Sequence, residues 1–377
     1  MKSLKLFLVA YICSGIVLCA EPPSEFTALL EKASAGDAKA QFNIGLSYYE
    51  GEGVPKDSEK AFEWYLKAAE QGDKVAQYNI GCLYSAGEGV KRDSKKGFKW
   101  FQKSAEQGYA DALNIIASLY LEGKNFEGKN VEATDTEVTI IEVENIKGNS
   151  EKAFELFLQA AEQGHAMAQH NLGWLYHHGI GVKKDSEKGF EWHLKAAEQG
   201  FLGAQDDVAA AYYFGEGVEK DPNKAFEWYL KAAEQGLIDA QYKVGWSYSN
   251  GEGVAEDRKK GFEWYLKAAE QGLINNQHKH NQHKVEGWSF IDAQYKVGWS
   301  YTYGKGVEKN LKTGFEWYLR AAEQGHGKSQ YFVALAYAGG MGGIKKDVRK
   351  AKEWIAIAEK NNVPEVAEIL EVIELTE

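Results

Sequence analysis

One nine-residue phrase returns along this chain at a fixed interval, and that interval constrains the fold more than any other feature. The phrase is WYLKAAEQG at residues 64–72, and near copies of it end at Gly108, Gly164, Gly200, Gly236, Gly272 and Gly325. Wherever nothing is inserted, the step equals the 36 residues between Gly72 and Gly108. A second phrase, Gly-x-Gly-Val, keeps the same step from Gly51 onward. A period of roughly 20 to 50 residues indicates one supersecondary unit copied along the chain.

The first half of each unit is predicted to be a helix. Ala40, Ile44 and Tyr48 recur every four residues and therefore share one helical face with Gly45. Glycine lowers helix propensity. We therefore interpret Gly45 as a packing residue that lets a neighbouring helix approach closely.

The second half of each unit is predicted to be a helix with defined ends. Pro222 directly follows Asp221, as in a first helical turn, which indicates that Asp221 and its counterparts, such as Asp57, are N-caps. Tyr65 and the small alanines form the buried stripe, and Gly72 supplies a left-handed stop. Each unit is thus predicted to be a helix-turn-helix hairpin.

The full pattern is Ala-Gln-x-x-(Ile/Leu/Val)-Gly-x-x-Tyr, then Gly-x-Gly-Val, then (Ala/Gly)-Phe-x-Trp-x-x-(Lys/Arg)-Ala-Ala-Glu-Gln-Gly. It resembles the Sel1-like repeat of the tetratricopeptide superfamily and covers residues 38–362 as eight repeats. The resemblance implies an all-α fold, a right-handed α-solenoid with a curved inner surface. It also implies a scaffold or adaptor role without enzymatic activity.

The two ends of the chain are predicted to be a signal peptide and two helical caps. Residues 1–20 carry Lys2 and Lys5 before an apolar stretch and end at Ala20, which is typical of a cleaved secretory signal. An uncleaved anchor and a lipoprotein acylated at Cys19 are the alternatives. We expect capping helices at residues 21–37 and 363–377 and a periplasmic or secreted location.

The net charge argues against nucleic acid as a partner, and the cysteine content argues against stabilisation by a disulfide. The net charge is −11, which argues against nucleic acid as a partner. Signal cleavage would remove two of the three cysteines and leave Cys82 alone, so no intrachain disulfide is expected. After cleavage we also expect no membrane insertion.

Two insertions interrupt the series, at about residues 124–149 and 273–290. The first contains the β-branched segment 137–143, which could pair as a hairpin with residues 126–131. It is either an acidic recognition loop or a tolerated surface insertion. The second contains His278, His280 and His283, which could bind a metal. However, residues 281–290 closely resemble 293–301, so an imperfect duplication explains this segment without a metal.

No motif predicts catalysis, and we expect no catalytic residues, no metal site and no cofactor. The Gly-x-Gly-Val loops follow helices rather than strands and lack the Lys of a phosphate loop. His165, His170, His177 and His178 form a group, but about 10 Å of helical rise separates His170 from His177, so we expect a solvated face. Some Sel1-like proteins hydrolyse β-lactams, yet those are cysteine-rich and this chain is not.

The binding surface is predicted from positions that vary between repeats on one face of the first helix. In the superfamily the first helices line the inner curve, so the resemblance implies an aromatic groove. The predicted groove residues are Phe42, Tyr78, His170, Trp174, Tyr242, Trp246, Tyr295, Trp299 and Tyr331. The alternative is that Trp174, Trp246 and Trp299 only pack between repeats. The constant tryptophans, such as Trp64 and Trp264, are expected to serve core or inter-repeat packing.

Together these features predict a secreted or periplasmic interaction scaffold that binds a protein or peptide of unknown identity in its concave groove. A peptidoglycan- or glycan-binding envelope protein is the first alternative. A cell-wall or β-lactam-hydrolysing enzyme is the second.

Overall fold

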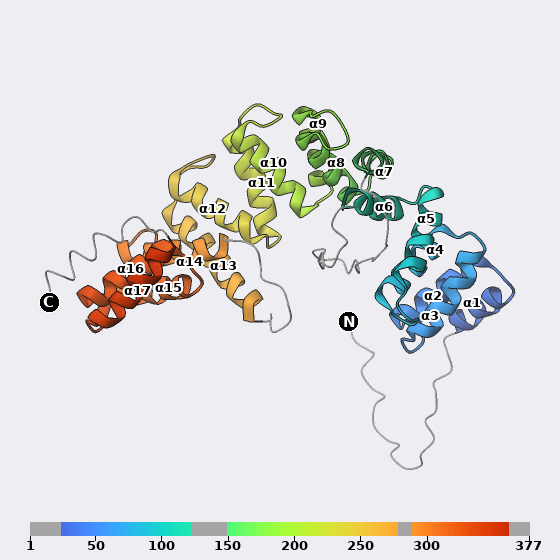
Figure 1. Cartoon of the computed structure of the whole chain (residues 1–377), viewed down its shortest axis with the longest axis horizontal. Helices are drawn as coiled ribbons and strands as arrows, with labels where there is room; N and C mark the ends of the chain where they lie inside the picture. The colour runs from blue at the N-terminus through green and yellow to red at the C-terminus, as the bar shows by residue number, and fades with distance from the viewer. Residues whose placement is uncertain (1–23, 123–148, 278–288, 362–377) are drawn as a thin grey trace, which may run out of the picture. The chain divides into compact units, whose positions relative to one another are not determined.

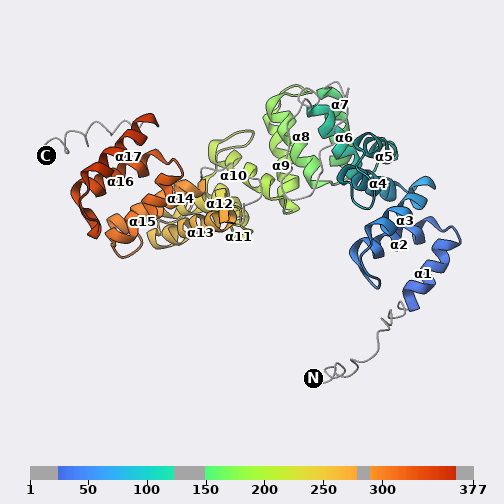
Figure 2. The same ribbon diagram turned by 60° about the horizontal axis from the view of Figure 1, so that its bottom comes forward.

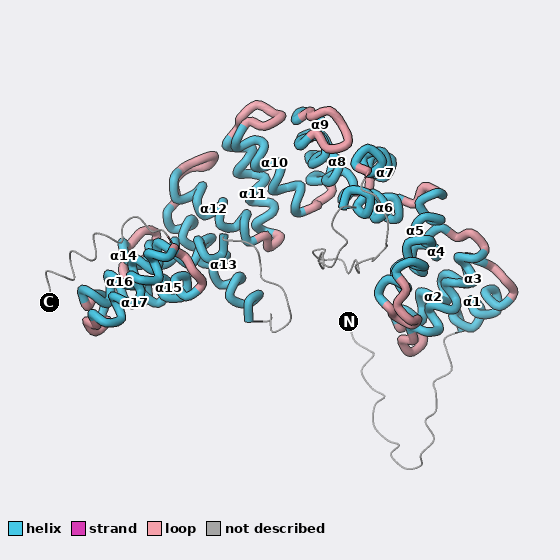
Figure 3. Tube along the Cα trace, in the orientation of Figure 1, coloured by secondary structure: helices cyan, strands magenta, loops and turns pink. Residues whose placement is uncertain are grey.

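The computed structural model describes residues 24–122, 149–277 and 289–361, and all regular structure in these ranges is helical (Figures 1 and 3). The chain divides into two compact units, residues 1–148 and 149–377. The first unit contains α1 (Ser24–Ser34), α2 (Ala38–Glu50), α3 (Ser58–Glu70), α4 (Lys74–Ala86), α5 (Ser94–Glu106) and α6 (Ala110–Glu122). The second contains α7 (Ser150–Glu162), α8 (Ala166–His178), α9 (Ser186–Glu198), α10 (Leu202–Phe214), α11 (Pro222–Glu234), α12 (Ile238–Asn250), α13 (Arg258–Gln277), α14 (Ser289–Tyr303), α15 (Leu311–Glu323), α16 (Gly327–Gly339), a short 3-10 turn η1 (Met341–Gly343) and α17 (Val348–Lys360).

Within each unit, helices pack mainly on their neighbours in sequence, as the views in Figures 1 and 2 show for α8 to α12. The two helices of a repeat form a hairpin whose second helix begins at the predicted cap. The Asp57 carboxylate accepts a hydrogen bond from the Lys60 backbone N–H at 3.0 Å. The same cap is present at Asp93, Asp185, Asp221, Asp257 and Asp347. The predicted N-caps are therefore confirmed.

The glycine inside each first helix has the packing role that the sequence predicts. A Cβ atom added at Gly45 would lie 2.7 Å from Cδ1 of Tyr65, far inside van der Waals contact. Gly81 and Phe101, Gly245 and Tyr265, and Gly298 and Tyr318 repeat this arrangement. A buried aromatic ring lying on a helical glycine thus forms the centre of these hairpins.

In the Gly-x-Gly-Val loops after the first, the second glycine joins one repeat to the repeat before it. Gly253 has a φ of +73° and lies against the carbonyl group of Pro222, so a side chain there would collide with backbone. The same contact joins Gly89 to Ser58 and Gly217 to Ser186. Glycine is required here both for its backbone conformation and for the close approach.

A buried glutamine also joins consecutive repeats, and it binds a second glutamine within its own repeat. Gln169 is buried, donates through Nε2 to the carbonyl oxygen of Ala161 at 3.1 Å, and accepts from Nε2 of Gln199 at 2.6 Å. Equivalent bonds involve Gln41 and Gln71, Gln77 and Gln107, and Gln205 and Gln235. The buried glutamine satisfies a carbonyl at the end of the preceding helix, where intrahelical partners run out.

Gln169→Leu is expected to lower the free energy of unfolding by about 2 kcal/mol, because the Ala161 carbonyl and the Gln199 amide lose this partner. Leu113 occupies the same repeat position in the third repeat, so the shape is tolerated. Urea denaturation followed by circular dichroism measures the change. Gln199→Ala, at an exposed side chain, is the control and is expected to cost under about 1 kcal/mol. Equal costs for the two variants would contradict a structural role for the buried amide.

The start of the second insertion differs from the prediction. We expected the helix to end at Gly272, but α13 continues to Gln277 and Gly272 lies within it, packed against Phe290. In the regular repeats the next helix begins within two residues of this glycine and forces a turn. Here the next helix begins at Ser289, so the chain is free to continue as a helix.

Helix α1 occupies the position of the expected N-terminal cap, and its Phe26 and Ala33 pack against Ala40 and Ile44. Other expectations lie outside the described residues. These are the signal peptide 1–20, the hairpin expected within 124–149, the His278, His280 and His283 segment, and the C-terminal helix 363–377.

Candidate functional site

Six of the nine predicted groove residues occupy one repeat position on the first helices and are half-buried. They are Phe42, Tyr78, His170, Tyr242, Tyr295 and Tyr331. The ring of Phe42 lies 5.4 Å from that of Tyr65 on the second helix of its own hairpin. The rings of Tyr78 and Tyr242 make the same contact at 5.5 and 5.4 Å. Much of each of these rings therefore serves packing within the hairpin.

The other three predicted residues, Trp174, Trp246 and Trp299, lie one helical turn further along α8, α12 and α14. Trp174 is 40 % exposed, whereas Trp246 and Trp299 are half-buried. The ring of Trp246 meets the edge of Tyr213, from the preceding repeat, at 6.2 Å. Trp246 thus packs between repeats and also keeps part of its surface exposed.

Sequence reasoning missed two exposed aromatic residues beside these tryptophans. Phe214 and Tyr303 are 66 % and 50 % exposed and end α10 and α14. The Phe214 ring lies 4.9 Å from Tyr213, and Tyr303 lies 5.5 Å from Trp299. A signal was available, because other repeats carry Glu50, Ala86 or Asn250 at this position.

We name one surface of the second unit the aromatic strip. It consists of Trp174, Tyr213, Phe214, Trp246, Trp299 and Tyr303, on four consecutive first helices. Charged groups border it. Glu216 lies 3.6 Å from His177, and the Lys220 ammonium lies 5.5 Å from the centre of the Tyr213 ring. Burial and the nearby Glu252 raise the pKa of Tyr213, which keeps its hydroxyl protonated and able to donate a hydrogen bond.

His170 lies in a polar cluster rather than on the expected solvated face. Its Nε2 is 2.8 Å from Oδ2 of Asp207 on α10, and its ring centre is 5.3 Å from that of His193 on α9. Burial lowers the pKa of His193 to about 4, and the Asp207 charge only partly opposes this, so His193 is neutral near pH 7. His165 has a different role, because its Nδ1 accepts from the Ala168 N–H at 3.0 Å and caps α8.

Two of the constant tryptophans belong to hydrophobic clusters among the described residues, so they serve core or inter-repeat packing. Trp64 packs on a cluster that contains Phe26 of α1 and Ile44 of its own repeat, and Trp264 packs on a core that contains Tyr229 of the preceding repeat. Lys67 lies 3.8 Å from the Trp64 ring centre and covers its outer face. This prediction is confirmed for both residues.

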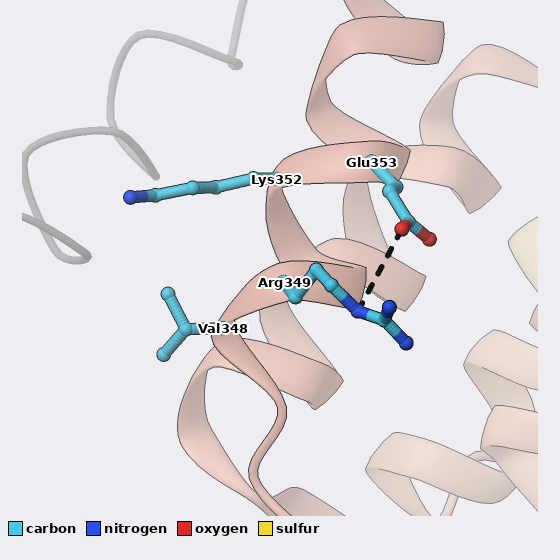
Figure 4. A pocket seen from close by; sticks show the side chains of 4 residues that line it. All are labelled: Val348, Arg349, Lys352 and Glu353. Carbon is cyan, nitrogen blue, oxygen red and sulfur yellow. Dashed lines mark ion pairs between the residues drawn. The ribbon is translucent and has the colours of Figure 1, made fainter.

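A hollow near the end of the described chain is not enclosed by facing elements. Among the described residues, Val348, Arg349, Lys352 and Glu353 line it, and all four belong to α17 (Figure 4). Arg349 pairs with Glu353 at 3.9 Å across one helical turn. Side chains from a single helix do not enclose a ligand, so this hollow is not a binding pocket. None of the described helices combines the length and apolar composition that crossing a bilayer requires.

Stacked helical hairpins with an exposed aromatic surface define a repeat protein of the α-solenoid class. The Sel1 repeat model matches residues 38–73, 74–109, 144–165, 166–201, 203–237, 238–273, 291–326 and 327–362. The chain therefore belongs to the Sel1 repeat family, and the predicted family and fold class are confirmed.

Two solved structures are similar over most of this chain. A protective antigen present in uropathogenic Escherichia coli strains, displaying an SLR fold, is 29 % identical with a TM-score of 0.78; the match covers 93 % of this chain and 67 % of that one. A Sel1 repeat protein from Oxalobacter formigenes is 28 % identical with a TM-score of 0.57, covering 82 % and 78 %. No curated protein matches the chain. Sel1 repeat proteins generally mediate protein–protein interaction, and the fold is typically a non-enzymatic scaffold.

Proposed function

We propose that this protein is a secreted or periplasmic scaffold that binds a segment of a partner protein along the aromatic strip. The observation that carries the proposal is the exposure of Trp174, Phe214 and Tyr303 on one series of helices. Aromatic residues are enriched at the centres of protein interfaces, and contiguous exposed apolar surface marks interaction sites.

The chemistry of the strip indicates what the partner segment contains. Its rings offer large, rigid contact area, so the segment needs apolar or aromatic side chains. Carboxylates such as Glu216 and Glu252 lie nearby, and the whole chain carries a net charge of −11. A segment that combines apolar with basic side chains complements this surface and would be steered toward it.

The location rests on the N-terminal sequence and on one relative. Lys2 and Lys5 precede an apolar stretch, as in a secretory signal. The relative from uropathogenic Escherichia coli is described as a protective antigen. Both support export of the chain from the cytoplasm.

The proposal is tested by site-specific photocrosslinking in cells. A photoreactive phenylalanine analogue at position 214 is expected to give one discrete crosslinked protein, while the same analogue at position 357 gives none. Ile357 is a matched control because it is 42 % exposed in the same unit but lies on α17, away from the strip.

Affinity for the crosslinked partner is then measured with purified proteins. Trp174→Ala combined with Phe214→Ala is expected to weaken binding at least about tenfold. Met341→Ala combined with Ile357→Ala removes similarly exposed apolar surface and is expected to leave binding unchanged. Equal affinities for the two double variants would remove the strip from the proposal. Sedimentation with peptidoglycan that depends on Trp174 would instead assign the strip to a glycan.

A further inference from the structure

Three side chains from three successive helices of the second unit meet at one point. His170 comes from α8, His193 from α9 and Asp207 from α10. Nε2 of His170 lies 2.8 Å, and Nε2 of His193 3.8 Å, from Oδ2 of Asp207. All three potential ligand atoms lie within 4.8 Å of one another.

Each of these residues departs from what the other repeats carry at its position. Where His170 stands, five repeats have an aromatic ring, and where His193 stands, Tyr or Phe is usual. The equivalents are Phe42, Tyr78, Tyr242, Tyr295 and Tyr331 for His170, and Tyr65, Phe101, Phe157, Tyr229, Tyr265 and Tyr318 for His193. For Asp207 they are Asn43, Asn79, Ile115, Asn171, Lys243, Lys296 and Phe332, none of them acidic. The repeat pattern explains none of the three, yet the fold brings all three together.

The cluster also contains a buried nitrogen whose hydrogen-bonding capacity is not satisfied. Nε2 of His193 is buried and has no hydrogen-bond partner among the described residues. Only 12 % of the His193 side chain is exposed, and the ring is held against Gly173. An unsatisfied buried polar atom destabilises the fold, so its presence points to a ligand that satisfies it.

We propose that His170, His193 and Asp207 bind one divalent transition-metal ion of the zinc class. Two imidazole nitrogens and one carboxylate oxygen form a donor set that such ions prefer. Metal–ligand bonds of about 2.0 to 2.2 Å place the ligand atoms of a tetrahedral site roughly 3.3 Å apart, so His170 and Asp207 must separate slightly and His193 must move closer to them. Each imidazole binds through Nε2 in its neutral form with its proton on Nδ1, and a ring that carries both protons releases one to solvent as the metal–nitrogen bond forms.

The surroundings suit a bound ion. Asp207 is 41 % exposed, which gives the ion a path from solvent, while Phe201 covers His170 with ring centres 5.0 Å apart. Three protein ligands leave one tetrahedral position for water. The prediction of no metal site considered two groups of histidines close together in sequence, near α8 and in the second insertion, whereas this cluster draws its ligands from three helices.

The test uses the chain without residues 1–20, free of any affinity tag, with His278, His280 and His283 changed to Asn to remove competing imidazoles. After chelator treatment and dialysis, this background protein is titrated with zinc chloride by calorimetry. We expect one ion per chain with micromolar or tighter affinity, and a rise in Tm with zinc.

The decisive variant restores the residues of the other repeats: His170→Tyr, His193→Tyr and Asp207→Asn. It is expected to bind zinc at least about 100-fold more weakly while keeping its Tm in chelator. Asp207→Asn alone, which preserves shape, is expected to weaken binding at least about tenfold. His177→Asn with His178→Asn is the control and should leave affinity unchanged. Zinc binding unaffected in the triple variant, or absent from the background protein, would overturn the proposal.

Discussion

Gly253→Ala is expected to lower the free energy of unfolding of the second unit by on the order of 4 kcal/mol. Two effects add at this residue. Its φ of +73° lies in the left-handed region that strains alanine, and the new Cβ would collide with the carbonyl group of Pro222 in the preceding repeat. Urea denaturation monitored by circular dichroism measures the loss.

Gly236→Ala separates these two effects. Gly236 also has a left-handed φ, of +97°, but the nearest atom to a new Cβ is Nε2 of Gln271 at 3.6 Å, an ordinary contact. This variant is expected to cost about 1 to 2 kcal/mol, from backbone strain alone. If Gly253→Ala costs no more than Gly236→Ala, the loop does not hold the two repeats together as described.

Tyr265→Ala is expected to cost about 4 kcal/mol of unfolding free energy. The Tyr265 side chain is only 3 % exposed, and its ring lies on Gly245 and 5.4 Å from the ring of Tyr242. Because the glycine has no side chain to fill the space, truncation leaves a cavity. The shift in the urea midpoint, at constant slope, gives the cost.

Phe214→Ala is the matched control, an aromatic residue of the same unit that is 66 % exposed. Its truncation is expected to change stability by less than about 0.5 kcal/mol. A similar loss for both variants would show that the hairpin core is not centred on the ring and its glycine.

The sequence predicts the hairpins, their caps and their packing glycines because each depends on residues close together in the chain. Asp57 needs only the N–H three residues later. Gly45 recurs in the same phrase of most repeats, so its role can be recognised before any coordinates exist. The family follows from the same spacing.

The contacts between repeats are harder to predict from the sequence, because they depend on how one hairpin packs against the next. Gln169 is visible in the repeat pattern, but its bond to the Ala161 carbonyl oxygen of the preceding repeat requires knowing which helices face each other. Likewise, His170 and Asp207 are 37 residues apart, one repeat and one residue, and nothing local predicts their contact. The prediction that the helix ends at Gly272 was wrong because an insertion removed the turn that normally follows this glycine.

The residues predicted to line the aromatic groove differ in exposure. Trp174 has the exposure expected of a binding residue, whereas Phe42 and its equivalents are half-covered by their own hairpins. Exposure depends on the neighbouring helix, which a helical face drawn from sequence does not include. Phe214 and Tyr303 were missed because they lie at helix ends, outside the face considered.

The side-chain bonds that join repeats here are short in sequence, spanning 30 residues from Ser58 to Glu88 and 39 from Tyr49 to Glu88. Each hairpin can therefore pack as soon as the preceding hairpin has formed, which favours stepwise folding during synthesis or export. The same locality lets whole hairpins be gained or lost by duplication and deletion while the remaining contacts persist. Proteins of this kind can thus diverge by changing the number of their repeats as readily as by substitution of single residues.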